Sequence, residues 1–253
     1  MKKIPRLMFL SLFACACKNT TPIISNRSVD LIAIVDVTDK QTVLPQAESI
    51  LKLYDFDSDR NIKASFRICS ITDRQLNPKK DTYLPNGSVT EKDNLQDDPY
   101  YREKLILSFY NGVRKDINDF SATNKNDTSL NHSECFRTIA DELNDMKNNQ
   151  AQKKILLIFS DLQENSDLFD CYKTKDQELL DKKQGEVLKI FEQANLLPND
   201  LKGIITIFIY DPRYRKDDQR YMSMVSIYKK LLESRGAIVK VQANGDVLNY
   251  SYE

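Results

Sequence analysis

The sequence is poor in the residues that several common functional sites need. It contains 6 glycines, 1 histidine and no tryptophan. A glycine-rich phosphate-binding loop is therefore not expected, because such a loop needs several glycines close together. The single histidine is His132, and the sequence has no G-x-S-x-G motif. We therefore predict an exposed loop histidine and no Ser-His-Asp triad.

The sequence also lacks an excess of charge and a cysteine framework. Lys and Arg together number 37, as do Asp and Glu, whereas a domain that binds nucleic acid usually carries a basic excess. We therefore expect no nucleic-acid partner. The body of the chain has cysteines at positions 69, 135 and 171. Their wide spacing matches neither a disulfide framework nor a metal-binding pattern, so we predict buried thiols at Cys69 and Cys135.

The N-terminus has the composition of an export signal. Lysine or arginine occupies positions 2, 3 and 6, and an apolar run follows over residues 7–14. This run is too short to remain in a bilayer as a spanning helix. We therefore predict a signal peptide over residues 1–14.

The end of this run resembles a bacterial lipoprotein signal. In such signals a leucine lies three places before a cysteine and a small residue directly before it, and the cysteine then carries the lipid. Leu12 and Ala14 place Cys15 in that position, while Cys17 is the alternative. The resemblance implies an exported protein, lipid-anchored to a bacterial membrane and facing the periplasm or the cell surface. Residues 15–28 would form the tether, and an ordinary secretory signal is the other interpretation.

Short apolar runs alternate along the chain with amphipathic stretches. The runs over residues 31–35, 155–160 and 203–210 are apolar at nearly every position, which is typical of strands covered on both faces. Residues 62–71 alternate between apolar and polar, so a strand nearer the sheet edge is predicted there. A final strand is expected over residues 237–241, and a short edge strand over residues 82–84 or 88–90.

Apolar positions three or four residues apart predict helices over residues 41–54, 102–120, 133–147, 186–194 and 220–234. Pro45 is expected in the first turn of the first helix, and Ser133 is expected to cap the third. We expect the acidic residues 161–181 and the charged residues 211–219 to form loops. Strands that alternate with helices indicate a single α/β domain over residues 29–253, with a doubly wound, mostly parallel sheet flanked by helices.

Oxygen-bearing side chains follow two of the predicted buried strands. Asp36 and Thr38 come after the first strand, and Asp161 comes after the strand at residues 155–160. The carboxyl ends of the central strands form the crevice where open α/β sheets bind ligands. Carboxylates and hydroxyls without a neighbouring histidine or cysteine suit a hard cation, Mg²⁺ or Mn²⁺.

From about Val29 to Val241 the pattern resembles a von Willebrand factor type A (vWA) domain. In that family the first strand ends in a D-x-S-x-S motif, a later loop supplies a Thr or Ser, and an Asp ends the fourth strand. Together they form a metal-ion-dependent adhesion site, to which the bound ligand often supplies a carboxylate. The resemblance assigns Asp36, Thr38 and Asp161 to the metal. The loop hydroxyl falls among Thr128, Ser129 and Ser133, and we favour Ser133 because it opens a predicted helix.

Three positions depart from the family's pattern. Thr38 replaces the first Ser of the motif, Lys40 replaces the second, and Leu162 stands where a Gly often follows the last Asp. An ammonium group cannot ligate a cation. Two interpretations follow: a divergent Mg²⁺ or Mn²⁺ site, or a vestigial site in which Asp36 caps backbone N–H groups and Lys40 pairs with Asp161.

Two classes of function remain open. The first is a non-enzymatic, membrane-anchored binding protein that recognises a protein partner through the crevice, and this is our prediction. The second is a metal-dependent phosphatase or hydrolase that uses Asp36. Phosphatases of the haloacid dehalogenase type place an Asp in this position but need a second acid two residues on, where this chain has Thr38. A purely structural lipoprotein is a further alternative.

Overall fold

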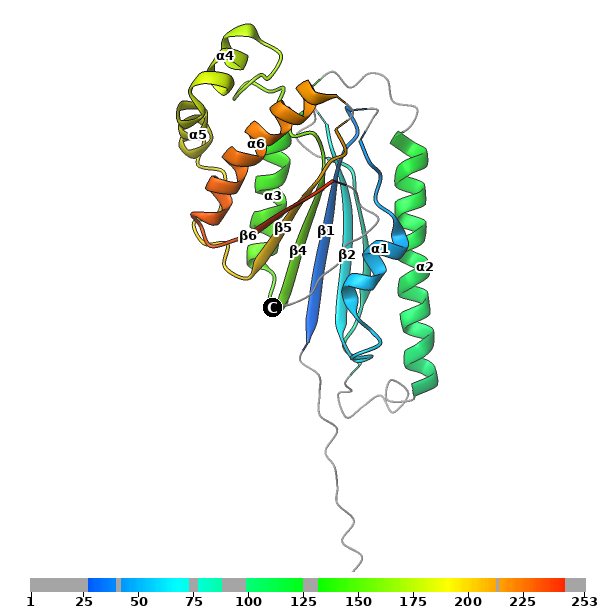
Figure 1. Ribbon diagram of the computed structural model, residues 1–253. Coiled ribbons are helices and arrows are strands. Elements are labelled where there is room, and N and C mark those ends of the chain that lie inside the picture. The colour runs from blue at the N-terminus through cyan, green and yellow to red at the C-terminus, as the bar shows by residue number, and fades with distance from the viewer. Residues whose placement is uncertain are drawn as a thin grey trace, which may run out of the picture.

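The structure is a computed structural model that describes residues 27–39, 42–72, 77–87, 99–124, 132–212 and 214–243. Within these residues the chain forms one sheet of six strands and six α-helices (Figure 1). The strands are β1 (Ser28–Asp36), β2 (Lys63–Ile71), β3 (Lys79–Leu84), β4 (Lys153–Phe159), β5 (Ile204–Ile209) and β6 (Ile238–Gln242). The helices are α1 (Ala47–Leu51, continued by a 3₁₀ turn at Lys52–Tyr54), α2 (Pro99–Asn124), α3 (Cys135–Asn148), α4 (Thr174–Lys182), α5 (Gln184–Gln193) and α6 (Arg215–Glu233).

The sheet order is β3-β2-β1-β4-β5-β6. All neighbouring strands are parallel except β2 and β3, which are antiparallel. The chain winds outward from β1 to β3 in one direction and from β4 to β6 in the other. The point at which the winding reverses therefore lies between β1 and β4, which is where doubly wound sheets bind their ligands. This arrangement confirms the predicted α/β fold class.

Helices cover both faces of the sheet, so the central strands are buried on both sides (Figure 1). In β1 every residue from Val29 to Asp36 is buried. Ile32 and Ile34 belong to the core under α3 and α6, whereas Leu31 and Ala33 belong to the core under α1 and α2. Burial on alternating sides is the physical reason why the run is apolar at every step.

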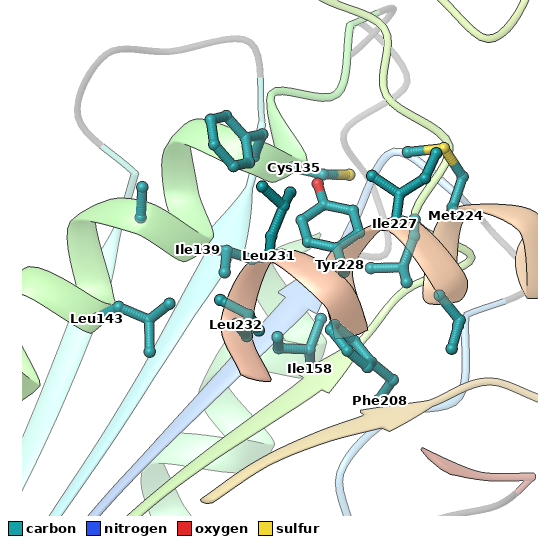
Figure 2. Packing of buried hydrophobic residues seen from close by; sticks show 14 of the residues in the cluster. Cys135, Ile139, Leu143, Ile158, Phe208, Met224, Ile227, Tyr228, Leu231 and Leu232 are labelled. Carbon is teal, nitrogen blue, oxygen red and sulfur yellow. The ribbon is translucent and has the colours of Figure 1, made fainter. Parts of the chain in front are cut away.

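The larger core lies between the sheet and the helices α3, α5 and α6. Figure 2 shows how side chains of α3 (Ile139, Leu143) and α6 (Tyr228, Leu231, Leu232) meet Ile158 of β4 and Phe208 of β5. The three cysteines of the described chain, at positions 69, 135 and 171, are buried free thiols, as predicted for the first two. None of the described helices has the length and apolar character needed to cross a membrane.

Several predicted boundaries were wrong. The first helix begins only at Ala47, after Pro45, because Gln46 is still extended, with φ −97° and ψ 122°. The acidic segment contains α4, and α6 begins at Arg215 rather than at residue 220. The first turn of α6 carries two acids, which suit the positive end of a helix. This turn has no apolar periodicity from which the start of the helix could have been predicted.

Other predictions fall on residues outside the described ranges. These are the signal peptide over residues 1–14, the lipidation residue Cys15 with its alternative Cys17, and the position of Lys40. The edge strand was predicted at residues 82–84 or 88–90, and the structure has it as β3, Lys79–Leu84. Residues 88–90 lie outside the described chain.

Candidate functional site

The ends of β1 and β4 lie side by side at the point where the winding of the sheet reverses. The strands are paired in parallel register up to Val35 and Phe159. Asp36 therefore stands beside the residues that follow β4, Ser160 and Asp161. The negative charge of Asp36 contributes to the raised pKa of Asp161, as expected for two neighbouring carboxyl groups. The structure thus brings together the two acids that the sequence singled out.

Asp36 is buried, with 1% of its surface exposed, and four N–H and O–H donors converge on its carboxylate. Its Oδ1 accepts from the Thr38 backbone N–H at 3.0 Å and from the Thr38 hydroxyl at 2.6 Å. Its Oδ2 accepts from the Ser160 hydroxyl at 2.8 Å and from the Ser133 hydroxyl at 3.2 Å. Burial raises the pKa of Asp36, and the hydrogen bonds from Thr38 and Ser160 only partly oppose this effect.

Ser133 is brought to the site but does not cap α3, contrary to our prediction. Helix α3 begins at Cys135. Its N-cap residue is Glu134, and the Glu134 side chain makes no capping hydrogen bond. The Ser133 hydroxyl donates to Asp36 instead, because a buried carboxylate is the stronger acceptor nearby. A buried acid from the β4–α4 segment takes the capping role: Glu164 Oε2 accepts from the Phe136 N–H at 2.8 Å.

A backbone bridge fixes Ser133 in this position. Ser133 and Asn165 exchange two hydrogen bonds, of 3.2 Å and 2.9 Å. The segment that follows β4 therefore holds the loop that precedes α3. Burial raises the pKa of Glu164, which lies in the same segment, to about 8, although the Phe136 N–H stabilises the ionised form.

Asp161 is 8% exposed, and Gln163 occupies both of its oxygens. Oδ1 accepts from the Gln163 backbone N–H at 2.9 Å, and Oδ2 accepts from the Gln163 side-chain Nε2 at 2.7 Å. Burial, followed by the charge of Asp36, raises the pKa of Asp161 to about 7. No ion pair to Asp36 or Asp161 is formed by the residues that the structure describes.

Leu162 takes the backbone conformation for which glycine is usually needed. Its φ is +60°, a left-handed value that strains most L-residues. Its side chain is fully buried in the core, and its N–H donates to the Ser160 hydroxyl at 2.9 Å. These interactions offset the strain and turn the chain sharply after β4, which places Asp161 and Gln163 beside the end of β1.

Two site residues, Gln163 and Cys135, were missed from the sequence. Gln163 lies two positions after Asp161, and this nearness in the chain was the only available signal. Cys135 also lies at the site, with its Sγ 3.1 Å from the Ser133 oxygen and 3.8 Å from Asp36 Oδ2. Figure 2 shows the Tyr228 hydroxyl directed toward Cys135, and this buried hydroxyl has no hydrogen-bond partner. Burial raises the pKa of both side chains, so both are uncharged.

The donor set fits a hard cation. In the described parts of the chain no group of three or more His, Cys, Asp or Glu side chains could hold a metal ion. A cation would instead be held by two carboxylates, the hydroxyls and bridging waters, which is how Mg²⁺ is usually bound. Gln163 Oε1 is a buried oxygen with no hydrogen-bond partner, and it supports this fit. Lys40 and the alternative hydroxyls of Thr128 and Ser129 lie outside the described residues.

The geometry does not favour either catalytic alternative. A nucleophilic Asp36 would have to reach the phosphorus atom of a substrate that is much larger than a cation, but only 1% of its surface is exposed. The second acid of such phosphatases would stand two residues after Asp36, but this position is Thr38, whose hydroxyl donates to Asp36. His132 is exposed, and the neighbouring Ser133 hydroxyl bonds to Asp36.

Comparison with known proteins gave no match for this chain, either among protein-family models or among curated proteins.

Proposed function

We propose that this chain is a membrane-tethered lipoprotein whose vWA-like domain recognises a protein partner through a divalent cation, Mg²⁺ or Mn²⁺. The cation is held at the ends of β1 and β4 by Asp36, Thr38, Ser133 and Asp161, directly or through bridging waters. One observation carries the proposal. Two neighbouring carboxyl groups are buried at the ligand-binding point of a doubly wound sheet, and neither has a cationic partner within the described residues.

Burial without a countercharge is costly, because ionised carboxylates lose their hydration. The raised pKa of Asp36 and the pKa of about 7 for Asp161 express this cost. A bound dication would supply the missing charge and would offer an open position to a carboxylate of the partner. Thr38 and Ser133 orient Asp36 for this task through hydrogen bonds of 2.6 Å and 3.2 Å.

An exposed aromatic side chain in the segment after β4 could also contact the partner. Tyr172 is 58% exposed. After burial, the negative charge of Asp161 is the largest cause of the raised pKa of Tyr172. Exposed tyrosines often anchor protein partners, because they combine a large apolar area with a hydroxyl group.

The crevice points away from the start of the domain. Ser28 and Asp36 lie at opposite ends of β1, a strand of nine residues, which at about 3.3 Å per residue corresponds to about 26 Å. A tether attached before Ser28 would therefore hold the base of the domain at the membrane and present the crevice to a partner.

Thermal unfolding of the full-length chain with and without Mg²⁺ tests the cation. A ligand that binds only the folded state stabilises it by about 2.7 kcal/mol at a concentration of 100 times its Kd, so we expect Tm to rise with Mg²⁺. The rise should vanish in Asp161→Asn and persist in Asp57→Asn, a control at an exposed position. A wild-type Tm that does not respond to Mg²⁺ or Mn²⁺ would leave the site vestigial and end the proposal.

The partner is tested separately, by capture from the native membrane on immobilised wild-type protein and on the Asp161→Asn variant. A partner that is retained only by the wild type, and that a chelator releases, is the expected result. A partner that binds both proteins equally, with or without the chelator, would contradict recognition through the cation.

A further inference from the structure

The side-chain amide of Gln163 is buried at the site, and only one of its two polar atoms has a hydrogen-bond partner. Its side chain is 8% exposed and lies against Asp161, where Nε2 donates to Oδ2 at 2.7 Å. The other atom of the same amide group, Oε1, is buried and has no hydrogen-bond partner. Buried polar atoms nearly always have partners in folded proteins, so an orphaned acceptor needs an explanation.

The surroundings of Oε1 indicate what is missing. An acceptor oxygen needs a hydrogen-bond donor or a cation. Two buried carboxyl groups, Asp36 and Asp161, lie at the neighbouring ends of β1 and β4 without a countercharge in the described part of the chain. A single cation beside Asp161 would satisfy the carboxylates and the amide oxygen together, and amide oxygens are common ligands of hard cations.

The backbone keeps Gln163 in place whichever way its amide points. The Gln163 N–H donates to Asp161 Oδ1 at 2.9 Å. The neighbouring Leu162 N–H is bonded to the Ser160 hydroxyl at 2.9 Å. Rotation of the terminal amide therefore exchanges Nε2 for Oε1 beside Asp161 without moving the main chain, because this torsion is soft and roughly two-fold.

We propose that Gln163 is a two-position ligand of the crevice: its Nε2 holds Asp161 when no cation is bound, and its Oε1 binds the cation when one is present. This inference rests on the proposed function. The amide acts as a neutral placeholder that keeps Asp161 oriented and the crevice closed to competing groups. It then adds an oxygen to the cation, so that Gln163 and Asp161 bind it as a pair.

Mn²⁺ titration of the full-length chain, followed by the electron paramagnetic resonance signal of free Mn²⁺, tests this role without any partner. Gln163→Met keeps the length of the side chain and removes both polar atoms. We expect its Kd for Mn²⁺ to rise about tenfold, the lower end of the usual cost of losing a supporting group at a metal site. Gln193→Met, a change at an exposed position of α5, is the matched control and should leave Kd unchanged.

The outcomes separate the two proposals. If the wild type binds no Mn²⁺, the proposed cation site fails and this inference fails with it. If the wild type binds and Gln163→Met binds as tightly or more tightly, only the inference fails, because Gln163 would then merely block Asp161.

A second measurement on the wild type does not depend on the folding of a variant. In a chain labelled with ¹⁵N-glutamine, the side-chain NH₂ signal of Gln163 reports its bond to Asp161, and the Gln163→Glu spectrum assigns it. Addition of Mg²⁺ should shift this signal towards the position of a free amide and speed its hydrogen exchange. An unchanged signal at saturating Mg²⁺ would overturn the proposed rotation.

Discussion

Two regions of the molecule bury an acidic side chain to the same degree but surround it with different partners, basic side chains in one region and uncharged donors in the other. Glu142 of α3 and Asp36 of β1 are each 1% exposed. Glu142 is paired with Arg67 Nη1 at 3.0 Å and with Lys79 Nζ at 2.5 Å. Asp36 receives only uncharged donors. Within the described residues, the fold thus pairs one buried acid with its own basic side chains and provides no basic side chain to the other.

The difference lies in where each acid sits. Glu142 faces the half-exposed edge formed by β2 and β3, where Arg67 also binds Asp81 and Asp145, each at 2.7 Å. Long basic side chains can reach this edge from the surface and keep their heads partly in water. Asp36 is the last residue of the central strand β1 and lies beside the end of β4, where the winding of the sheet reverses, and this is where doubly wound sheets bind their ligands.

The largest expected effect is on the pH dependence of the free energy of unfolding in the presence of a chelator. The pKa of Asp161 is about 7 in the folded protein, against an ordinary value of 3.8 for an aspartate side chain. Between these values the folded state keeps a proton that the unfolded state has lost, so stability falls as pH rises from about 4 to about 7. A shift of this size corresponds to a loss on the order of 4 kcal/mol.

Urea unfolding at a series of pH values, with a chelator and with saturating Mg²⁺, measures this slope. Glu164, whose pKa is about 8, adds to it and extends the fall to about pH 8. Asp161→Asn should remove the Asp161 share of the slope, and Mg²⁺ should flatten the curve because the cation favours the ionised carboxylate. A curve that does not fall over this range would mean that the crevice acids carry no burial cost and that the contrast with Glu142 is false.

The second effect concerns the acid that is already neutralised. Arg67→Met should lower the free energy of unfolding by about 2–3 kcal/mol, below the usual 3–5 for breaking a buried pair, because Arg67 is partly exposed and Lys79 remains beside Glu142. Arg60→Met is the control, since its pair with Glu103 is exposed and worth at most about 1 kcal/mol. Equal losses in the two variants would show that Glu142 does not depend on its partners.

The smallest expected change in the free energy of unfolding concerns Leu162, in the turn after β4. Leu162→Gly relieves a left-handed φ of +60° but removes a fully buried side chain. Relief of about 1 kcal/mol against a loss of about 3 kcal/mol predicts a net loss of about 2 kcal/mol. Asn195→Gly, at an exposed residue with φ +52°, should be neutral or slightly stabilising. A stabilised Leu162→Gly variant would show that strain, and not packing, dominates this turn.

The elements best predicted from the sequence are those whose signal is local. Strands covered on both faces must be apolar at every step, so β1, β4 and β5 were evident, and the acids at the ends of β1 and β4 followed from the topology of parallel sheets. The start of α6 was missed because its first turn is exposed and charged and carries no periodic pattern.

The finer features of the site depend on partners distant in the chain. Ser133 has the chemistry of an N-cap, and only the fold shows that Asp36, far away in sequence, takes its hydroxyl and that Glu164 supplies the cap. Gln163 was missed for a similar reason. Its relation to Asp161 depends on the turn at Leu162, which has the positive φ that is unexpected for leucine.

Calorimetric titration of Mg²⁺ into the full-length chain near pH 6, repeated in two buffers with different ionisation enthalpies, tests the central claim most directly. With a pKa of about 7, Asp161 is mostly protonated at that pH, and a cation bound there must displace the proton. We expect the wild type to bind Mg²⁺ and to release close to one proton per bound cation. We expect no binding to Asp161→Asn. Absence of binding to the wild type, or binding without proton release, would contradict the claim that the buried acids Asp36 and Asp161 form a binding site for a divalent cation.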